Sequence, residues 1–209
     1  MENVLLIHGG LWEDVGADWF WRRTGVVDGL AARGLTVVAP DRLRRAPSWT
    51  AESEQLASVV RRLPGGGLPV TVVGGSFGCA AAVRLALDFP DLVRRLVLAW
   101  PATLGDQFTA IRFRAGLARQ GAPASVLNAL LGAQTLPGAS DAELSTLAVP
   151  AGVLPAVPPD AVHPRSAVDS LLRLLPSAVE LPGCPEPPRP EFASHLALFV
   201  DAVTAFAMT

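Results

Sequence analysis

The 209 residues of the chain fit a single domain with room for an insertion. Half of the residues are hydrophobic and 17% are charged, which excludes a disordered chain. The net charge of −2 excludes a positive electrostatic field that would attract nucleic acid or an anionic membrane. All 17 basic residues are arginine and tyrosine is absent, which excludes a P-loop lysine, a Schiff-base lysine, a Ser-Lys pair and Tyr-Lys dehydrogenase chemistry.

The cysteines and histidines indicate no metal or redox site. Cys79 and Cys184 form neither a disulfide framework nor a CxxC pair, and His8, His163 and His195 lack metal-binding spacing. The N-terminus lacks the basic stretch of a signal peptide, and no long apolar run is free of proline, glycine clusters or charge. We therefore expect a cytoplasmic protein without metal, cofactor or transmembrane helix, whose partner is a small-molecule substrate.

Short apolar runs alternate with helical patterns along the first hundred residues, which is typical of βαβ units. Strands are predicted over 4–7, 35–39, 69–73 and 96–100, and helices over 18–33, 50–63 and 77–89. Thr50 is the expected N-cap of the second helix, and Pro64-Gly-Gly-Gly67 is expected to end it. Because the strands are continuous apolar runs, they predict a parallel sheet that helices cover on both faces.

The strand pattern stops between residues 102 and 149, where helices are predicted near 106–119, 123–131 and 141–147. It resumes with strands over 151–157 and 178–181 and helices over 166–175 and 192–208. The sequence therefore predicts one α/β domain over 1–209, with a doubly wound, mostly parallel six-stranded sheet and a small helical cap inserted at 102–149.

The most informative motif is Gly74-Gly-Ser76-Phe77-Gly78, a G-x-S-x-G sequence between the third predicted strand and the helix that follows. In this context the chain turns sharply at the serine, and a side chain at Gly74 or Gly78 would collide with a neighbouring element. The turn exposes the Ser76 hydroxyl at the carboxyl end of the sheet, where the helix N-terminus favours a developing negative charge. Ser76 is the predicted nucleophile.

A serine nucleophile needs an adjacent base, which a carboxylate orients in turn. His195 follows the last predicted strand and comes after a plausible acid, so it is the predicted base. His163 is expected on the surface of a loop, and His8 is expected to brace the loop after the first strand by hydrogen bonding. Asp160, just beyond the strand 151–157, is the predicted acid, and Asp106, after the fourth strand, is the alternative.

The tetrahedral intermediate of acyl transfer needs two backbone N–H groups directed at its oxygen. Phe77 follows the nucleophile and is predicted to supply one, and Gly10, or as second choice Leu11, is predicted to supply the other. Leu11, Trp12 and Trp100 lie near strand ends and are candidates to line an acyl or alcohol pocket, although a tryptophan belongs to the core as often as to a pocket.

Five segments in chain order carry a resemblance to a known family: His8-Gly9-Gly10, Ala39-Pro40-Asp41-Arg42, Gly74-Gly-Ser-Phe-Gly78, Pro159-Asp160-Ala-Val-His-Pro164 and the late His195. Together they resemble the α/β-hydrolase superfamily over nearly the whole chain. The resemblance implies a Ser76–Asp160–His195 triad, an oxyanion hole from Gly10 and Phe77, and a helical cap. The chain starts directly on the His-Gly strand, without the antiparallel hairpin usual in the family, so we expect six parallel strands in the order 2-1-3-4-5-6. Pro159 also departs from the family, in which an acidic or small residue often precedes the acid.

The function predicted from these residues is that of a serine hydrolase of the carboxylesterase type. It would cleave a small or medium carboxylic ester, thioester or lactone through an acyl-enzyme intermediate. Two alternatives stay open: an enzyme of the same fold with a non-hydrolytic step, such as C–C cleavage or cyclisation, and a ligand-binding scaffold without turnover.

Overall fold

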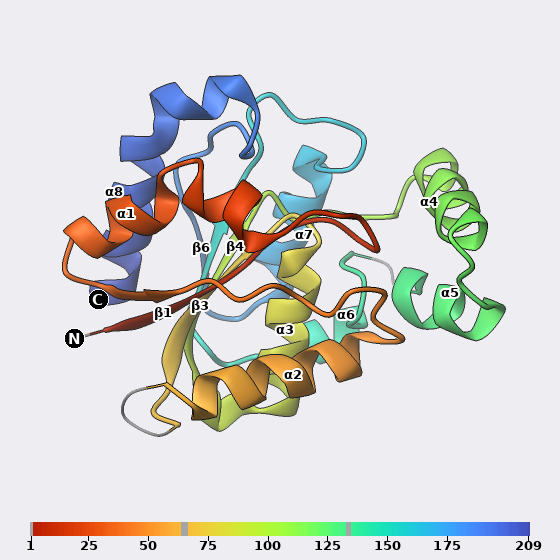
Figure 1. The fold of residues 1–209 in the computed structure, drawn as a ribbon, viewed down its shortest axis with the longest axis horizontal. Coiled ribbons are helices and arrows are strands. Elements are labelled where there is room, and N and C mark those ends of the chain that lie inside the picture. The colour runs from red at the N-terminus through yellow and green to blue at the C-terminus, as the bar shows by residue number, and fades with distance from the viewer. Residues whose placement is uncertain (1, 64–66, 133–134) are drawn as a thin grey trace.

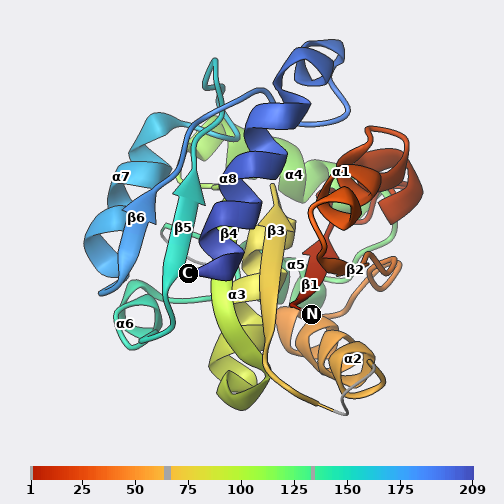
Figure 2. The same ribbon diagram turned by 90° about the vertical axis from the view of Figure 1, so that its left-hand side faces the viewer.

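The computed structural model describes residues 2–63, 67–132 and 135–209, so most of the predicted break at 64–67 lies outside the described residues. Six parallel strands form one sheet in the order β2-β1-β3-β4-β5-β6, as predicted (Figures 1 and 2). The strands are β1 (Asn3–Ile7), β2 (Thr36–Val38), β3 (Val70–Gly75), β4 (Val93–Ala99), β5 (Ala151–Leu154) and β6 (Ala178–Glu180). Because all are parallel, the loops that follow them leave the same edge of the sheet.

Helices cover both faces of the sheet, which explains the continuous apolar strands. Leu5 and Ile7 of β1 face a core shared with α2 (Trp49–Arg61), α3 (Gly78–Asp88) and α7 (Arg165–Leu174). Val4 and Leu6 face the opposite core, which contains α1 (Val26–Ala32) and α8 (Leu196–Met208). The short helix η2 (Pro90–Leu92) precedes β4.

Several predicted boundaries differ from the structure. The helix expected over 18–33 is divided into η1 (Asp18–Arg22) and α1, because Gly25 between them has the left-handed φ of 81°. The N-cap of α2 is Ser48 rather than Thr50, since the Ser48 side chain accepts a hydrogen bond from the backbone N–H of Ala51. The last predicted helix likewise begins with a separate helix, η3 (Pro190–His195).

Among the described residues between β4 and β5, three helices lie close to the predicted positions. They are α4 (Gln107–Arg119), α5 (Ala124–Leu131) and α6 (Asp141–Leu144). Helices α4 and α5 stand at one side of the sheet in Figure 1. Their role as a cap stays a prediction.

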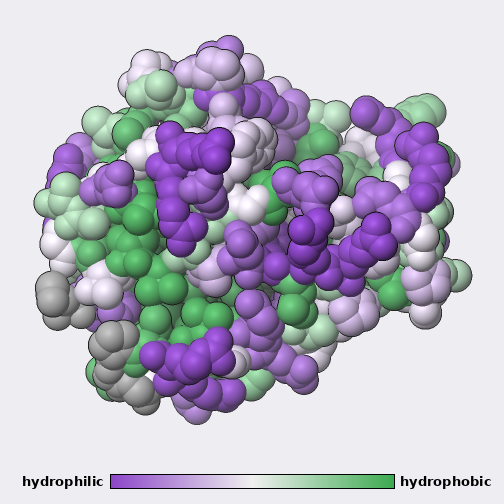
Figure 3. Space-filling view, in the orientation of Figure 1, coloured by the Kyte–Doolittle hydropathy of each residue, from purple (hydrophilic) through white to green (hydrophobic). Residues whose placement is uncertain are grey.

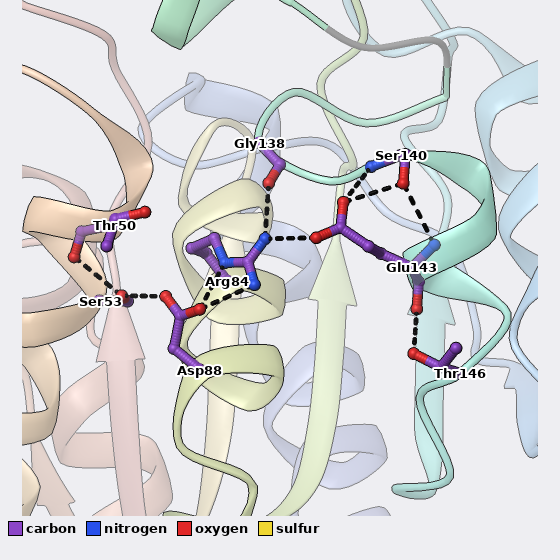
Figure 4. A network of polar contacts seen from close by, with 8 residues as sticks. All are labelled: Thr50, Ser53, Arg84, Asp88, Gly138, Ser140, Glu143 and Thr146. Atoms are coloured by element: carbon purple, nitrogen blue, oxygen red, sulfur yellow. Dashed lines mark hydrogen bonds and ion pairs between the residues drawn. The ribbon is translucent and has the colours of Figure 1, made fainter.

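A polar network joins the end of this helical segment to the main domain (Figure 4). Arg84 of α3 donates hydrogen bonds to Asp88 on its own helix and to Glu143 of α6, at 2.7 Å and 2.9 Å. Ser53 of α2 donates in turn to Asp88. The network fixes α6 against α3, so at least this part of the insertion belongs to the body of the fold.

The surface view in Figure 3 shows hydrophobic residues gathered between α1 and α2, and mostly hydrophilic residues towards α4 and α5. Among the described residues, one helical segment, Pro190–Met208, is long and apolar enough to cross a membrane by length and composition alone. A helix from the core of a globular domain passes the same test; 28% of the apolar window in this segment is buried, including Phe199 and Val203.

Candidate active site

Ser76 lies on a sharp turn between β3 and α3, as the G-x-S-x-G motif predicts. Its φ of 53° is left-handed, which strains a residue with a side chain. The flanking glycines are sterically required: a Cβ on Gly74 would lie 2.6 Å from the carbonyl oxygen of Gly78, and one on Gly78 would overlap the carbonyl oxygen of Ile7. The turn therefore holds the serine hydroxyl at the carboxyl edge of the sheet.

His163 lies directly beside this serine. Its Nε2 is 2.8 Å from the Ser76 Oγ, and the imidazole is only 7% exposed. His163 belongs to the loop after β5. The backbone N–H of Thr103 donates a hydrogen bond to the carbonyl of Val162 and so holds this loop in place. The geometry lets the serine hydroxyl donate its proton to Nε2.

Asp160 orients this histidine from three residues earlier in the same loop. Its Oδ1 lies 3.1 Å from the His163 Nδ1 and also accepts the backbone N–H groups of Val162 and His163. Its Oδ2 accepts a 2.6 Å hydrogen bond from Arg189. Burial acts to raise the pKa of Asp160, but the hydrogen bonds from His163 and Arg189 and the charge of His163 outweigh it and lower the pKa to about 2. The carboxylate is therefore ionised and accepts the Nδ1–H, which leaves Nε2 free to accept a proton.

The structure does not bring His195 to Ser76, so its predicted position has to be corrected. The ring lies at the end of η3, where its Nδ1 bonds to the carbonyl of Glu191. The chain has by then left the sheet edge and is entering α8. His163, expected on the surface, takes the place beside Ser76. The signal in the sequence was the spacing of Asp160 and His163, which lets a single turn after a strand supply both the carboxylate and the imidazole.

The alternative acid, Asp106, has a different role. Its carboxylate caps the N-terminus of α4 by accepting the backbone N–H of Thr109 at 2.7 Å. That hydrogen bond lowers the pKa of Asp106, and the carboxyl group is exposed to solvent. Of the two candidates, Asp160 is the acid that contacts a histidine at the serine.

The loop after β1 is held by an unusual number of buried hydrogen bonds. His8 bonds through Nδ1 to the carbonyl of Gly9 and accepts the backbone N–H of Arg42 at Nε2, so it braces this loop as predicted. Burial, followed by the charge of Arg42, lowers the pKa of His8 and favours its neutral ring. The Arg42 guanidinium donates to the carbonyls of His8 and Gly10 and makes a bidentate pair with Glu52.

Gly10 and Phe77, the predicted oxyanion-hole residues, both line the cavity that contains Ser76. The cavity has a volume of about 410 Å³. Gly10 has a left-handed φ of 82°, which a residue with a side chain rarely adopts. The Phe77 N–H stands at the start of α3, and its ring packs edge-on against Phe113 of α4.

The three predicted pocket residues lie in three different surroundings. Leu11 lines a second cavity of about 570 Å³ under α4, which shares Glu13, Phe113 and Val162 with the first. Trp12 donates from its indole to the carbonyl of Ala46 and lies beside Arg45, away from the serine cavity.

Trp100 is fully buried, and its assignment to the pocket is wrong. Its ring stacks on Phe199 and meets Phe192 edge-on, and its indole N–H donates to the carbonyl of Cys184. Trp100 therefore belongs to the aromatic core under α8.

Glu186, on the loop between β6 and η3, is a site residue that the sequence analysis missed. Its Oε2 lies 3.7 Å from the His163 Nε2, and its side chain is 15% exposed. Burial raises the pKa of Glu186, against the opposing effects of His163, Ser76 and Arg189. A second carboxyl group thus flanks the imidazole, on the side opposite Asp160. Among the described residues, no cluster of His, Cys, Asp and Glu is placed to hold a metal ion.

The parallel sheet, the serine on its turn and the buried histidine beside it define an enzyme of the α/β-hydrolase fold. A family model described as "Alpha/beta hydrolase family" matches residues 4–177, so the chain belongs to this family. This confirms the resemblance inferred from the motifs. A search of curated proteins finds no match.

Solved structures with the same fold cover nearly the whole chain. A meta-cleavage product hydrolase from Pseudomonas fluorescens IP01 is 20% identical, with a TM-score of 0.68 over 99% of this chain and 92% of that chain. A serine hydrolase involved in carbazole degradation is 17% identical, with a TM-score of 0.71 over 98% and 91%. The thioesterase domain of the curacin biosynthetic pathway is 18% identical, with a TM-score of 0.61 over 100% and 91%. At these identities the likeness establishes the fold alone.

Proposed function

We propose that the protein is a serine hydrolase that cleaves small or medium carboxylic esters, or the corresponding thioesters or lactones, through an acyl-enzyme intermediate. The observation that carries the proposal is the 2.8 Å contact between the Ser76 Oγ and the His163 Nε2, with Asp160 on the other ring nitrogen. This is the arrangement that activates a serine nucleophile.

In the proposed reaction, the Ser76 Oγ attacks the substrate carbonyl carbon while its proton passes to the Nε2 of His163. Asp160 accepts the Nδ1–H throughout and stabilises the imidazolium that forms. The imidazolium then donates its Nε2 proton to the leaving alcohol or thiol. A water molecule, deprotonated by the same nitrogen, releases the acid and restores the serine.

The negative charge that develops on the carbonyl oxygen requires donors already in place. We propose the backbone N–H groups of Phe77 and Gly10 for this role. Both residues line the cavity with Ser76, and Arg42 holds the Gly10 carbonyl at 2.7 Å, which restrains the peptide next to the donor. The volume of about 410 Å³ suits a small or medium substrate.

A fluorophosphonate probe tests the proposal, because it phosphonylates only an activated serine. We expect mass mapping to find the label on Ser76, and to find none after Ser76→Ala. Hydrolysis of p-nitrophenyl acetate, butyrate and octanoate should then report the preferred acyl length. An unlabelled Ser76 in a folded protein would refute the proposal and favour the scaffold without turnover.

A further inference from the structure

Glu186 holds a position next to both reacting side chains that the proposed mechanism does not use. It lines the cavity with Ser76 and His163, and its Oε2 is 3.7 Å from the nitrogen that receives the serine proton. Asp160 already orients the imidazole from Nδ1, so the triad is complete without a second carboxyl group. Some other role must offset the cost of placing Glu186 there.

Permanent cations compensate this carboxyl group only at a distance. In the part of the chain that the structure describes, no arginine lies within ion-pair distance of the Glu186 side chain. The nearest one along the loop, Arg189, lines the same cavity and its charge acts to lower the pKa of Glu186, but its guanidinium pairs directly with Asp160 at 2.6 Å. A largely buried carboxylate without a cationic partner is unfavourable, and the raised pKa of Glu186 reflects this cost.

A cationic group on the substrate would supply the missing partner as it binds. Aromatic side chains stand around the same cavity, with Trp19 46% exposed and Phe20 and Phe113 also in its wall. The faces of such rings attract ammonium groups. An ammonium next to the scissile carbonyl would therefore meet a carboxylate and aromatic side chains in one pocket.

We propose that Glu186 is a specificity-determining residue that selects substrates with a protonated or quaternary amine close to the scissile carbonyl. This inference rests on the proposed serine-hydrolase function and names its substrate class. The carboxylate pairs with the ammonium in the Michaelis complex, and it stays paired while the imidazolium forms beside it. A neutral substrate leaves Glu186 without that partner, and an anionic substrate is repelled.

The test compares acetylthiocholine with S-(3,3-dimethylbutyl) thioacetate, which has the same shape without the charge. Thiol release at pH 8 gives kcat/KM for each. We expect the charged substrate to be favoured by about tenfold, the effect of one desolvated ion pair. Glu186→Gln should bring the ratio close to one and Glu186→Asp should retain most of it. Glu191→Gln, which removes the same charge from an exposed residue of η3, the helix that follows the loop, should leave it unchanged.

A second measurement does not depend on turnover of either thioester. Choline should slow fluorophosphonate labelling of Ser76 at concentrations where 3,3-dimethylbutanol does not, and Glu186→Gln should abolish the difference. A ratio near one in the unaltered enzyme, or a preference that survives Glu186→Gln, would overturn the inference. Either result would leave the serine hydrolase standing as long as Ser76 is labelled, whereas an unlabelled Ser76 refutes the proposed function itself.

Discussion

Replacing each histidine by alanine separates the two candidate bases. His163 lies 2.8 Å from the Ser76 Oγ, and its loss removes the proton acceptor. Loss of one triad member typically costs about 10⁴ to 10⁶ in kcat, or about 5.5 to 8 kcal/mol of activation free energy. Glu186 lies near the vacated position and can accept the proton in part, so we expect His163→Ala to lose about 10³ to 10⁴ in kcat. His195→Ala should stay within about twofold, because its ring bonds only to its own helix.

The assay is p-nitrophenyl butyrate hydrolysis under saturating substrate, with circular dichroism to establish that both variants are folded. Fluorophosphonate labelling gives an independent measure, since the labelling rate of Ser76 should fall with kcat in His163→Ala. If His195→Ala were the inactive variant and His163→Ala retained activity, the assignment from geometry would be wrong.

Three further changes probe the groups around the site. Asp160→Asn should lower kcat by about 10⁴, because an amide no longer fixes the imidazole tautomer. Asp106→Asn should have little effect on kcat, since asparagine caps helices as well as aspartate does. Equal losses of kcat in steady-state assays of the two variants would contradict this. Arg42→Met should lower the free energy of unfolding, measured in urea, by about 3–5 kcal/mol, because it leaves the carboxylate of Glu52 buried and unpaired. A change below about 1 kcal/mol would show that water reaches the Arg42–Glu52 ion pair. Glu186→Gln should raise the free energy of unfolding at pH 8 and lose this advantage below pH 4.5. The reason is that a carboxyl group whose pKa is raised on folding destabilises the fold only once it ionises. If the variant were still more stable than the unaltered protein in acid, its extra stability would have another cause.

Local pattern was enough to predict most of the fold. The continuous apolar runs at residues 4–7, 69–73 and 96–100 predicted buried parallel strands, and β1, β3 and β4 lie over them. The strand order, which was expected from the family resemblance rather than from local pattern, is also the observed one. The elements that differed were those in which a single residue changed the local backbone, such as Gly25 between η1 and α1. Propensity averaged over a helix does not register such a break.

The histidine beside Ser76 was the part of the site that sequence order misjudged. The expected chain order of serine, acid and histidine favoured His195, which follows the last strand. The pattern of apolar and polar residues does not show how far the chain continues along the sheet edge before it enters a helix. Glu186 gave no sequence signal either, because it belongs to no motif and acts through its neighbours in space.

The sequence by itself determined the position of Ser76, because the sterics of its turn are local: two glycines, a strand before and a helix after suffice to require it. It also determined that Asp160 stands at the same edge of the sheet, since strand ends in a parallel sheet share one edge. Only the tertiary structure decided which imidazole reaches the serine. The loops after β3, β5 and β6 converge through the pairing and twist of strands far apart in the chain, and a contact of 2.8 Å depends on the sum of those placements. The same convergence places Glu186 beside His163. Trp100, which was predicted to line the pocket, packs against Phe199 in the core instead.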